Sequence, residues 1–332
     1  MAGVTKLTQL NLGKETVSGT DAAATVKWLG PYSFVDKGDP VFNQENIGRM
    51  WTRNRSHIPM TGVDITIEST EASYELLPIL FNLAFGEATE QADNTSWYSQ
   101  WTMPTTAVQT PTTATIEYGD NSSVAANSIK QSTYCYIKDI TLTGAGRGAV
   151  MVSANLGGRG VSTESAFTSI SPFTVETINF GGGSLTIDDT AVYTTAKTVT
   201  LMGYTITFNP GWMEIPSIER KDYTSLKQVN PSISGQLRFE HNATAIDAVA
   251  QKEAETIQYI QIQHLGTAIT GTSHENKKLR MQLPVRYTKV SSLESDNGNN
   301  VVTVDFITVD DLSANPGTVL IAHDNADVWA GA

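Results

Sequence analysis

The sequence predicts a mainly β fold, in which two similar β-barrel or β-sandwich domains are each flanked by one short α-helix. Three observations support this fold class. The chain of 332 residues contains 43 Thr and 26 Gly, which suit half-buried strands and the turns between them. Apolar and polar residues alternate through most of the chain, and the order of the predicted elements occurs twice.

Strands are predicted where the alternation has a period of two. Residues 63–68, 204–208 and 257–263 show this period clearly, as expected for strands with one buried face. The sequence Asp-Asn-Gly-Asn lies between residues 287–293 and 301–307. Because this turn sequence joins two alternating segments, it predicts a β-hairpin.

Only two segments have the apolar spacing of a helix. Residues 73–85 begin with the capping residue Ser73 and stop before Gly86, and Pro78 fits only if it lies in the first turn. Residues 244–256 begin with a capping Thr. The predicted buried stripes consist of Leu76, Leu77, Leu80, Leu83 and Ala84 in the first helix and of Ile246, Val249 and Ala250 in the second.

The predicted elements repeat along the chain, with low identity between the two copies. The strand that ends at Glu68 matches the strand that ends at Glu240, an offset of 172 residues, and a helix follows each. The hairpin at residues 136–152 matches the one at 287–303, an offset of 151 residues. The offset falls by 172 − 151 = 21, which indicates an extra stretch in the first copy, within residues 87–115.

This repeat divides the chain into two predicted domains, residues 1–170 and 171–332. Each has a long segment rich in charged and aromatic residues, at about residues 36–58 and 211–229. Loops of this length usually have a function or are disordered. Arg and Trp are enriched in protein–protein interfaces, while a solvated loop or a contact with nucleic acid are the alternatives. The interface candidates are Arg49, Trp51, Arg53 and Arg55 in the first segment and Trp212, Arg220 and Tyr223 in the second.

Composition disfavours several classes of protein. With 22 Lys+Arg and 34 Asp+Glu, the net charge is −12, so the chain does not neutralise phosphates along a nucleic acid. Its single cysteine, Cys135, excludes an internal disulfide. The N-terminus lacks the apolar core of a signal peptide, and no run approaches 18 apolar residues. We therefore expect a soluble protein made in the cytoplasm, with no membrane association.

No arrangement of residues predicts catalysis. Residues 144–149 fit G-x-G-x-x-A, but the residues that follow have the composition of a strand, so a glycine-rich hairpin tip is favoured over a dinucleotide site. The five histidines lack metal-ligand spacing, and Cys135 lies in a strand where a packed thiol is favoured. The Asp188-Asp189 and Asp310-Asp311 pairs are typical of solvated turns. We expect no enzyme activity, cofactor or metal.

Several segments, taken in order, resemble the major tail tube proteins of long-tailed bacteriophages. They cover about residues 10–162, and the second half is similar to a diverged copy. The matching segments are Gly13-Lys14-Glu15-Thr16 with Gly19-Thr20, the long charged arm, Tyr74-Glu75-Leu76-Leu77-Pro78-Ile79-Leu80 with Ala84-Phe85-Gly86, Ile140-Thr141-Leu142-Thr143-Gly144, and Val152-Ser153-Ala154-Asn155-Leu156-Gly157-Gly158.

The resemblance implies a structural virion protein. Members of this family form rings in which sheets of neighbouring subunits join around a lumen, and stacked rings conduct the genome into the host cell. Their long loops reach from one ring to the next, so the resemblance implies that the segment at about residues 36–58 is an inter-ring arm. Two such domains in one chain imply that three chains form a pseudo-hexameric ring. The implied partners are copies of the chain, the tape measure, terminator and distal tail proteins, and DNA that passes without sequence-specific binding. The implied location is the phage tail, after assembly in the host cytoplasm.

Two other functions remain open on the sequence alone. A different ring component of a phage tail, such as a terminator or distal tail protein, is also β-rich. A carbohydrate-binding or adhesin module is the alternative from another class, with Trp97 and Trp101 beside Tyr98 as a sugar platform. Glycan binding would distinguish this module from a tube subunit.

Overall fold

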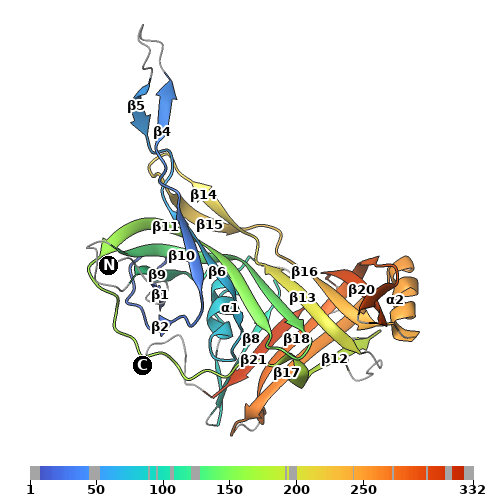
Figure 1. Cartoon of the computed structure of the whole chain (residues 1–332). Coiled ribbons are helices and arrows are strands. Elements are labelled where there is room, and N and C mark those ends of the chain that lie inside the picture. Colours follow the sequence, from blue (N-terminus) through green and yellow to red (C-terminus); the bar gives the residue numbers. More distant parts are fainter. Residues whose placement is uncertain are drawn as a thin grey trace.

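Antiparallel strands dominate the structure, and the part of the chain that it describes contains two short α-helices (Figure 1). The predicted mainly β class is therefore confirmed. The computed structural model describes residues 8–44, 53–88, 90–94, 96–104, 108–120, 128–190, 193, 200–241, 243–270, 273–296, 298–310 and 316–324.

The first half of the chain runs to the end of β11 and contains one helix, α1 (Leu77–Phe85), between β6 and β7. Its strands are β1 (Thr8–Lys14), β2 (Val26–Lys27), β3 (Tyr32–Asp36), β4 (Val41–Gln44), β5 (Arg53–His57), β6 (Val63–Glu71), β7 (Gln91–Asp93), β8 (Ser96–Thr102), β9 (Ala114–Asp120), β10 (Ile129–Ala145) and β11 (Met151–Glu164).

The second half begins with a short 3-10 helix, η2 (Phe180–Gly182), and contains α2 (Ala243–Glu253) between β16 and β17. Its strands are β12 (Gly183–Asp188), β13 (Leu201–Asn209), β14 (Trp212–Pro216), β15 (Tyr223–Gln228), β16 (Ser232–Glu240), β17 (Gln258–Ala268), β18 (Asn276–Val290), β19 (Glu294–Asp296), β20 (Asn299–Thr308) and β21 (Thr318–His323).

The strands pair in the same order in both halves. The order is β3-β6-β11-β10-β9-β1 in the first half and β13-β16-β20-β18-β17-β12 in the second. The end of β10 also pairs with β13, which joins the two halves. Eight strands, β3-β6-β11-β10-β13-β16-β20-β18, thus follow one another without a break; we call them the long sheet.

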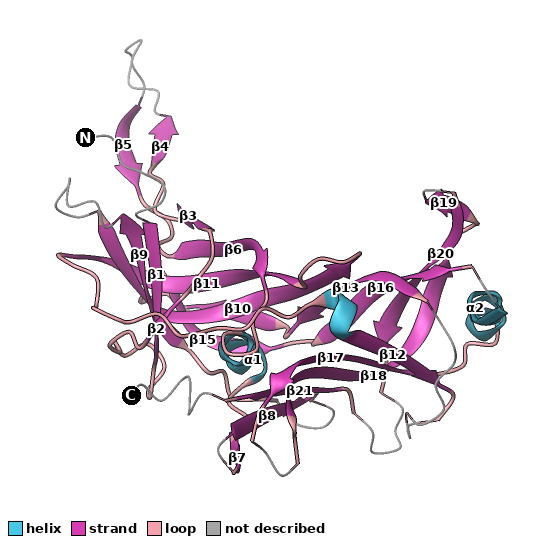
Figure 2. Cartoon of the chain, turned by 60° about the horizontal axis from the view of Figure 1, so that its bottom comes forward, coloured by secondary structure: helices cyan, strands magenta, loops and turns pink. Residues whose placement is uncertain are grey.

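Both ends of the long sheet are open among the described residues. There β3 pairs only with β6, while residues 286–290 of β18 and all of β19 pair only with β20. The two edges, β3 and β19, lie at opposite ends of the molecule (Figure 2). Backbone N–H and C=O groups at such edges are free to pair with another strand.

Each half inserts a two-stranded hairpin at the same point of this order. The hairpin β4-β5 lies between β3 and β6 in the chain, and the hairpin β14-β15 lies between β13 and β16. Figure 1 shows β4-β5 projecting away from the body, whereas β14-β15 lies beside β10 and β11. The extra stretch predicted at residues 87–115 contains β7 and β8, and β8 pairs with the C-terminal β21.

Helix α1 lies inside the molecule, between the two halves. All nine of its residues are buried, and the Phe81 ring lies 5.2 Å from the ring of Phe208 on β13. The predicted helix began at Ser73, but the structure has turns there and the helix starts at Leu77. Pro78, which cannot donate to a preceding turn, is in the first turn, as its chemistry requires. Gly86 follows the helix with a φ of 82°.

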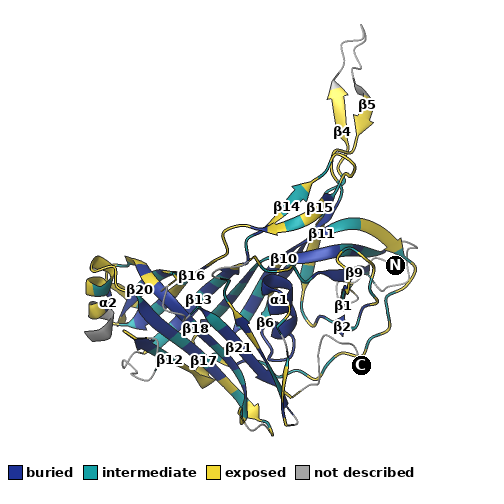
Figure 3. Cartoon of the chain, turned by 180° about the vertical axis from the view of Figure 1, so that it is seen from behind, coloured by how far each residue is buried: buried dark blue, intermediate teal, exposed yellow. Residues whose placement is uncertain are grey.

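Helix α2 is exposed at one end of the molecule, in contrast to α1 (Figure 3). It packs against β18, as α1 packs against β10. The predicted buried stripe is wrong at both positions whose side chains are described, because Val249 and Ala250 are exposed and Ala248 is buried instead. The side chain of Ile246 lies outside the described part. The two helices therefore occupy matching places in the strand order and differ in what covers them.

A β-bulge sets the register of both halves. In the first half the register shifts between Ile137 and Asp139, so that Lys138 is the extra residue. In the second half it shifts between Tyr287 and Lys289, which makes Thr288 the extra residue. The structural offset is 288 − 138 = 150, so the predicted offset of 151 was wrong by one residue. A slip of one residue reverses which side chains face the core.

Candidate functional site

One face of the long sheet is mostly polar, with Val35 and Ile307 as exposed apolar side chains near its two ends. Along each strand, buried apolar residues alternate with partly exposed polar ones, because successive side chains point to opposite faces. We call the outward row the polar face. Its members include Thr66 on β6, Asn155 on β11, Asp139 and Thr141 on β10, Thr207 on β13, Gln236 on β16 and Asp305 on β20.

Side chains of the polar face hydrogen-bond to each other across strands. Thr66 donates to Oδ1 of Asn155 at 3.0 Å, and Nδ2 of Asn155 donates to Asp139 at 2.9 Å. In the second half, Nε2 of Gln236 donates to Oδ1 of Asp305 at 2.8 Å. Such cross-strand pairs stabilise a sheet and fix the register of its strands. The face is therefore an ordered surface of short polar groups.

The polar face continues across the junction between the two halves. On this face the hydroxyls of Thr141 and Thr207 lie 3.0 Å apart. On the opposite face, Leu142 of β10 is paired with Ile206 of β13, and both side chains are fully buried. The junction is thus polar on one side and apolar on the other, like the strand pairs within each half.

The cations at the first-half end of the face are held by carboxylates. Nζ of Lys138 lies 2.6 Å from Asp64, and Nζ of Lys37 lies 2.9 Å from Asp64 and 3.3 Å from Glu214. Burial raises the pKa of Asp64, but the hydrogen bonds from both lysines outweigh it and hold that pKa below its usual value. In the second half Arg238 pairs with Asp296 at 3.1 Å. These cations are already paired within the chain.

The hairpin β14-β15 is fixed to the first half by an aromatic cluster. Tyr223 donates its hydroxyl to the carbonyl oxygen of Tyr134 at 2.5 Å, and its ring lies 5.8 Å from that of Tyr136. The indole of Trp212 donates to the carbonyl oxygen of Ala84, at the end of α1, at 2.8 Å. Trp212 and Tyr223 are 9% and 5% exposed. Two of the predicted interface residues therefore contact the other half of the same chain.

The other predicted interface residues do not join this cluster. Arg220 lies in the turn of the second hairpin, 2.6 Å from Asp222, and that contact raises its pKa. Arg55 is exposed on β5, opposite Asn43, and Arg53 begins the same strand. Arg49 and Trp51 lie outside the described residues.

Sequence reasoning missed the partners of the second hairpin. Tyr134 and Tyr136 flank Cys135, which the sequence marked only as a packed thiol. Tyr134 has a φ of 55°, and the register of β10 shifts on both sides of it. Two aromatic residues around a bulge are a signal that could have indicated a docking point. Their contact with residues 78 or more positions away could not be read from local sequence.

The residues considered above as possible cofactor-binding, nucleophilic or metal-binding positions have structural roles. A strand, β11, follows residues 144–149, which confirms the hairpin tip, and Gly146 has a φ of 62°. Cys135 is buried, and desolvation raises its pKa to about 12, so the thiol stays protonated at neutral pH. Within the described ranges, no group of three or more His, Cys, Asp or Glu could hold a metal ion.

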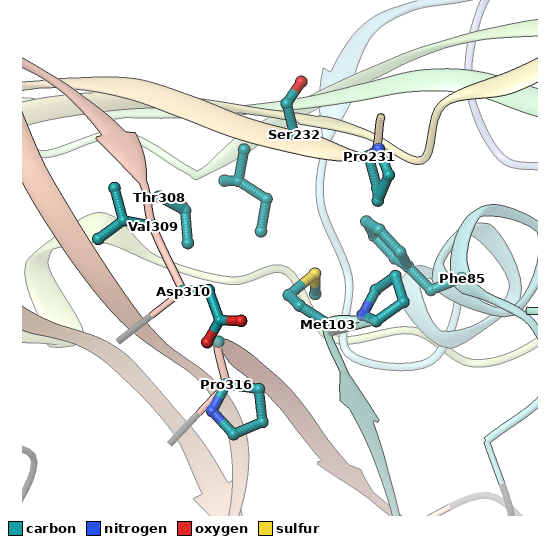
Figure 4. Close-up of a pocket in the computed structure, with 11 residues that line it drawn as sticks. Phe85, Met103, Pro231, Ser232, Thr308, Val309, Asp310 and Pro316 are labelled. Atoms are coloured by element: carbon teal, nitrogen blue, oxygen red, sulfur yellow. The ribbon is translucent and has the colours of Figure 1, made fainter. Parts of the chain in front are cut away.

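A mostly apolar cavity of about 160 Å³ lies where the two halves meet (Figure 4). Phe85 and Met103 of the first half face Pro231, Ile233 and Val309 of the second. Of its lining residues, only Asp310 carries a charge. Such a cavity lacks the paired polar groups that orient a substrate.

The proposed sugar platform is not assembled. Trp101 is 2% exposed and donates to Oδ1 of Asn82 at 3.1 Å, so it presents no ring face to solvent. Trp97, on the same strand, is partly exposed. A platform of two indoles is therefore absent from this strand.

Two further observations concern the whole chain. No helix in the described ranges has the length and apolar character needed to span a membrane. Comparison with protein-family models gave no match, and comparison with curated proteins gave none either.

Proposed function

We propose that this protein is the major tail tube subunit of a long-tailed bacteriophage. In this proposal copies close into rings, and the rings stack into a hollow tube that conducts the genome into the host. The observation that carries it is the long sheet, which is mostly polar along one face and open at both edges. A sheet of this kind can continue from one copy to the next, and closure removes its edges.

The proposal treats the halves as two tail-tube-like domains in tandem. The shared strand order supports this, as do the hairpins at matching places and the bulges at Lys138 and Thr288. The helices α1 and α2 also follow equivalent strands, β6 and β16. One hydrophobic cluster contains residues of both halves, so the two domains fold against each other rather than separately.

Strand arithmetic shows that a ring of three chains would be wide enough for DNA. Strands lie about 4.8 Å apart, so eight strands span about 38 Å of wall. Three chains give about 115 Å of circumference and a diameter of about 37 Å between backbones. The resulting number of strands exceeds the 16–18 of porins, which already enclose an aqueous channel. Strand tilt widens the wall further, which leaves room for a DNA duplex.

The polar face is the lining of the lumen in this proposal. Its short hydroxyl, amide and carboxylate groups can bind water along the wall. The cations Lys37, Lys138 and Arg238 already form ion pairs with carboxylates of the same chain. Arg286 and Lys289 on β18 add exposed cations to this face beside the carboxylate of Asp305. The proposal expects so mixed a lining to bind DNA phosphates weakly, so that the duplex passes without being retained. The other partners are the tape measure, terminator and distal tail proteins.

Electron microscopy combined with light scattering tests the function. We expect rings or tubes with a six-fold cross-section and a mass of three chains per ring. A mass of six chains per ring would keep the tube and refute the tandem-domain arithmetic. A monomer that forms neither rings nor tubes at high concentration, and that binds immobilised glycans, would refute the tube and favour the carbohydrate-binding alternative.

A further inference from the structure

The junction between the two halves has a counterpart that is left open. At the junction, β13 pairs with the end of β10, and Leu142 lies opposite Ile206. In the shared strand order β13 corresponds to β3, and the end of β10 corresponds to the end of β18 with β19. These are the two open edges of the long sheet. One chain therefore carries one formed junction and the two separate sides of a second.

The pairings identify which residue of β3 corresponds to Ile206. Starting from the bulge in the second half, Tyr287 pairs with Phe306, Phe306 with Gly235, and Gly235 with Ile206. Starting from the bulge in the first half, the same path leads through the pairs Ile137–Leu156, Leu156–Ile65 and Ile65–Phe34. Phe34 thus occupies the place of Ile206.

The same comparison identifies the residue that corresponds to Leu142. The offset of 150 makes Val301 the counterpart of Met151. Met151 pairs with Thr143, and Val301 pairs with Glu294. The residue before Thr143 is Leu142, and the residue before Glu294 is Leu293. The second half has one more residue here, because four positions from Val290 to Glu294 face three from Val304 to Val301. Traced through the partner strand, Leu293 thus occupies the place of Leu142, and both are leucine.

Exposure separates the formed junction from the open edges. Leu142 and Ile206 are 0% exposed and belong to the hydrophobic core shared by the two halves. Their counterparts Leu293 and Phe34 are 53% and 41% exposed. Apolar side chains that stay exposed on unpaired strands mark a surface that another strand covers. At the formed junction, the strand that covers each edge is the counterpart of the other open edge. A second copy of the chain therefore supplies the strand that each open edge lacks.

We infer that β3 of one copy pairs antiparallel with the end of β18 and β19 of the next copy, with Phe34 opposite Leu293. The pairing repeats the register of β13 on β10. It is head to tail, since the two edges differ and lie at opposite ends of the molecule (Figure 2). The inference rests on the proposed function for the ring, and it adds the strands, the register and the contacting residues.

A disulfide between copies tests the register. Thr143 pairs with Thr205 at the junction, so the inferred pairing places Glu294 opposite Ser33. The variant carrying Ser33→Cys and Glu294→Cys, mildly oxidised, should give covalent oligomers that stop at one ring, three chains. The matched control, Ser33→Cys with Asp296→Cys, is two residues out of register and should cross-link at least about tenfold less. The native Cys135 is buried and does not compete.

Charge on the edge provides an independent test. Leu293→Asp and Phe34→Asp should each raise the concentration needed for half-maximal ring assembly at least about tenfold, since each buries a charge between copies. Leu293 is exposed in the single chain, so the thermal midpoint of the Leu293→Asp monomer should stay unchanged. Phe34→Asp also removes the ring contacts with Tyr118 at 4.8 Å and with Lys130 at 5.6 Å, so it should lower the thermal midpoint of the monomer as well. Val17→Asp, at another exposed apolar residue, is the matched control and should assemble normally.

The outcomes separate this inference from the proposed function. Rings in the microscope, together with no preference for the Ser33–Glu294 pair, would overturn the inferred pairing and leave the tube proposal standing. Rings unaffected by both Asp substitutions would also overturn it. Neither rings nor cross-links at any concentration would refute both.

Discussion

The ammonium group of Lys277 lies 2.7 Å from Oε1 of Glu75, and the two residues come from different halves of the chain. Glu75 is fully buried, and its second oxygen accepts the backbone N–H of Glu176 at 2.8 Å. Lys277 also pairs with Asp324 at 2.7 Å, near the end of the described chain. This ion pair therefore ties the second half to the first.

Removing the cation should destabilise the whole chain. Lys277→Met leaves the Glu75 carboxylate buried without a counter-charge, so we expect the free energy of unfolding to fall by about 3–5 kcal/mol. Urea denaturation measures this change. Lys278→Met, one residue along the same strand, is the control and should cost much less. Equal losses for the two variants would contradict the role of the pair.

Acid should weaken the protein through His264. The hydroxyl oxygen of Tyr204 lies 2.8 Å from Nε2 of His264, and Nδ1 of the same ring lies 3.2 Å from the carbonyl oxygen of Asn179. Because a carbonyl only accepts, Nδ1 carries the proton and Nε2 accepts from the tyrosine hydroxyl. Burial disfavours the charged ring and lowers the pKa of His264 from 6.5 to about 4.

The direction of the effect follows from this lowered pKa. The stabilisation is complete above pH 6.5 and is lost as the pH falls toward 4, because the unfolded chain then binds a proton that the folded chain excludes. We expect a loss of about 3 kcal/mol over this range relative to His264→Gln, measured by denaturation at each pH. His241→Gln, at an exposed histidine, should follow the unchanged protein. Parallel pH profiles for all three would exclude this role of His264.

Positive charge on the polar face should make tubes retain DNA. Thr141→Lys with Thr207→Lys places two unpaired cations per chain at the junction between the halves, where each cation can bind a phosphate. We expect purified tubes of this variant to hold duplex DNA in a filter assay and to release it as salt increases. Thr16→Lys is exposed away from the polar face and should retain none. Tight retention by unmodified tubes would refute the lumen assignment.

The hairpin β4-β5 should be needed for stacking and dispensable for folding. It projects from the body, and Val41 and Phe42 are 46% and 55% exposed. Deleting residues 43–54 leaves β3 and the rest of the long sheet intact, so we expect soluble protein that forms single rings without tubes. Microscopy with circular dichroism measures both. Tubes of normal length would remove the hairpin from the stacking contact.

Much of the fold was predictable because its signals are local. Alternation located β6, β13 and β17, and glycine located the turn between β10 and β11. The burial of α1 on all sides was visible in its sequence, since Leu77–Phe85 is apolar except for Asn82. The helix nevertheless starts at Leu77 rather than Ser73, because residues 74–76 form turns and Pro78 fits only in the first turn of a helix.

The arrangement of the halves was not predictable, since it depends on contacts between residues far apart in the chain. Nothing in the alternation of β10 shows that its end pairs with β13, or that Trp212 reaches α1. The offset of 151 aligned Tyr136 with Tyr287, whereas the bulges at Lys138 and Thr288 align Ile137 with Tyr287. The residue pattern alone does not show which residue of each strand is the extra one. Trp212 and Tyr223 had the composition of an interface, and the partner in this structure is the same chain.

The formed junction at β10 and β13 has a consequence for how such a wall comes apart. In a ring of these chains, every second strand pairing between neighbouring domains is formed within one chain, so it does not depend on protein concentration. The other pairings are formed between two chains, so they dissociate on dilution. Dilution or mild heating should therefore release folded single chains before any chain unfolds, so disassembly and denaturation are separate events with separate midpoints.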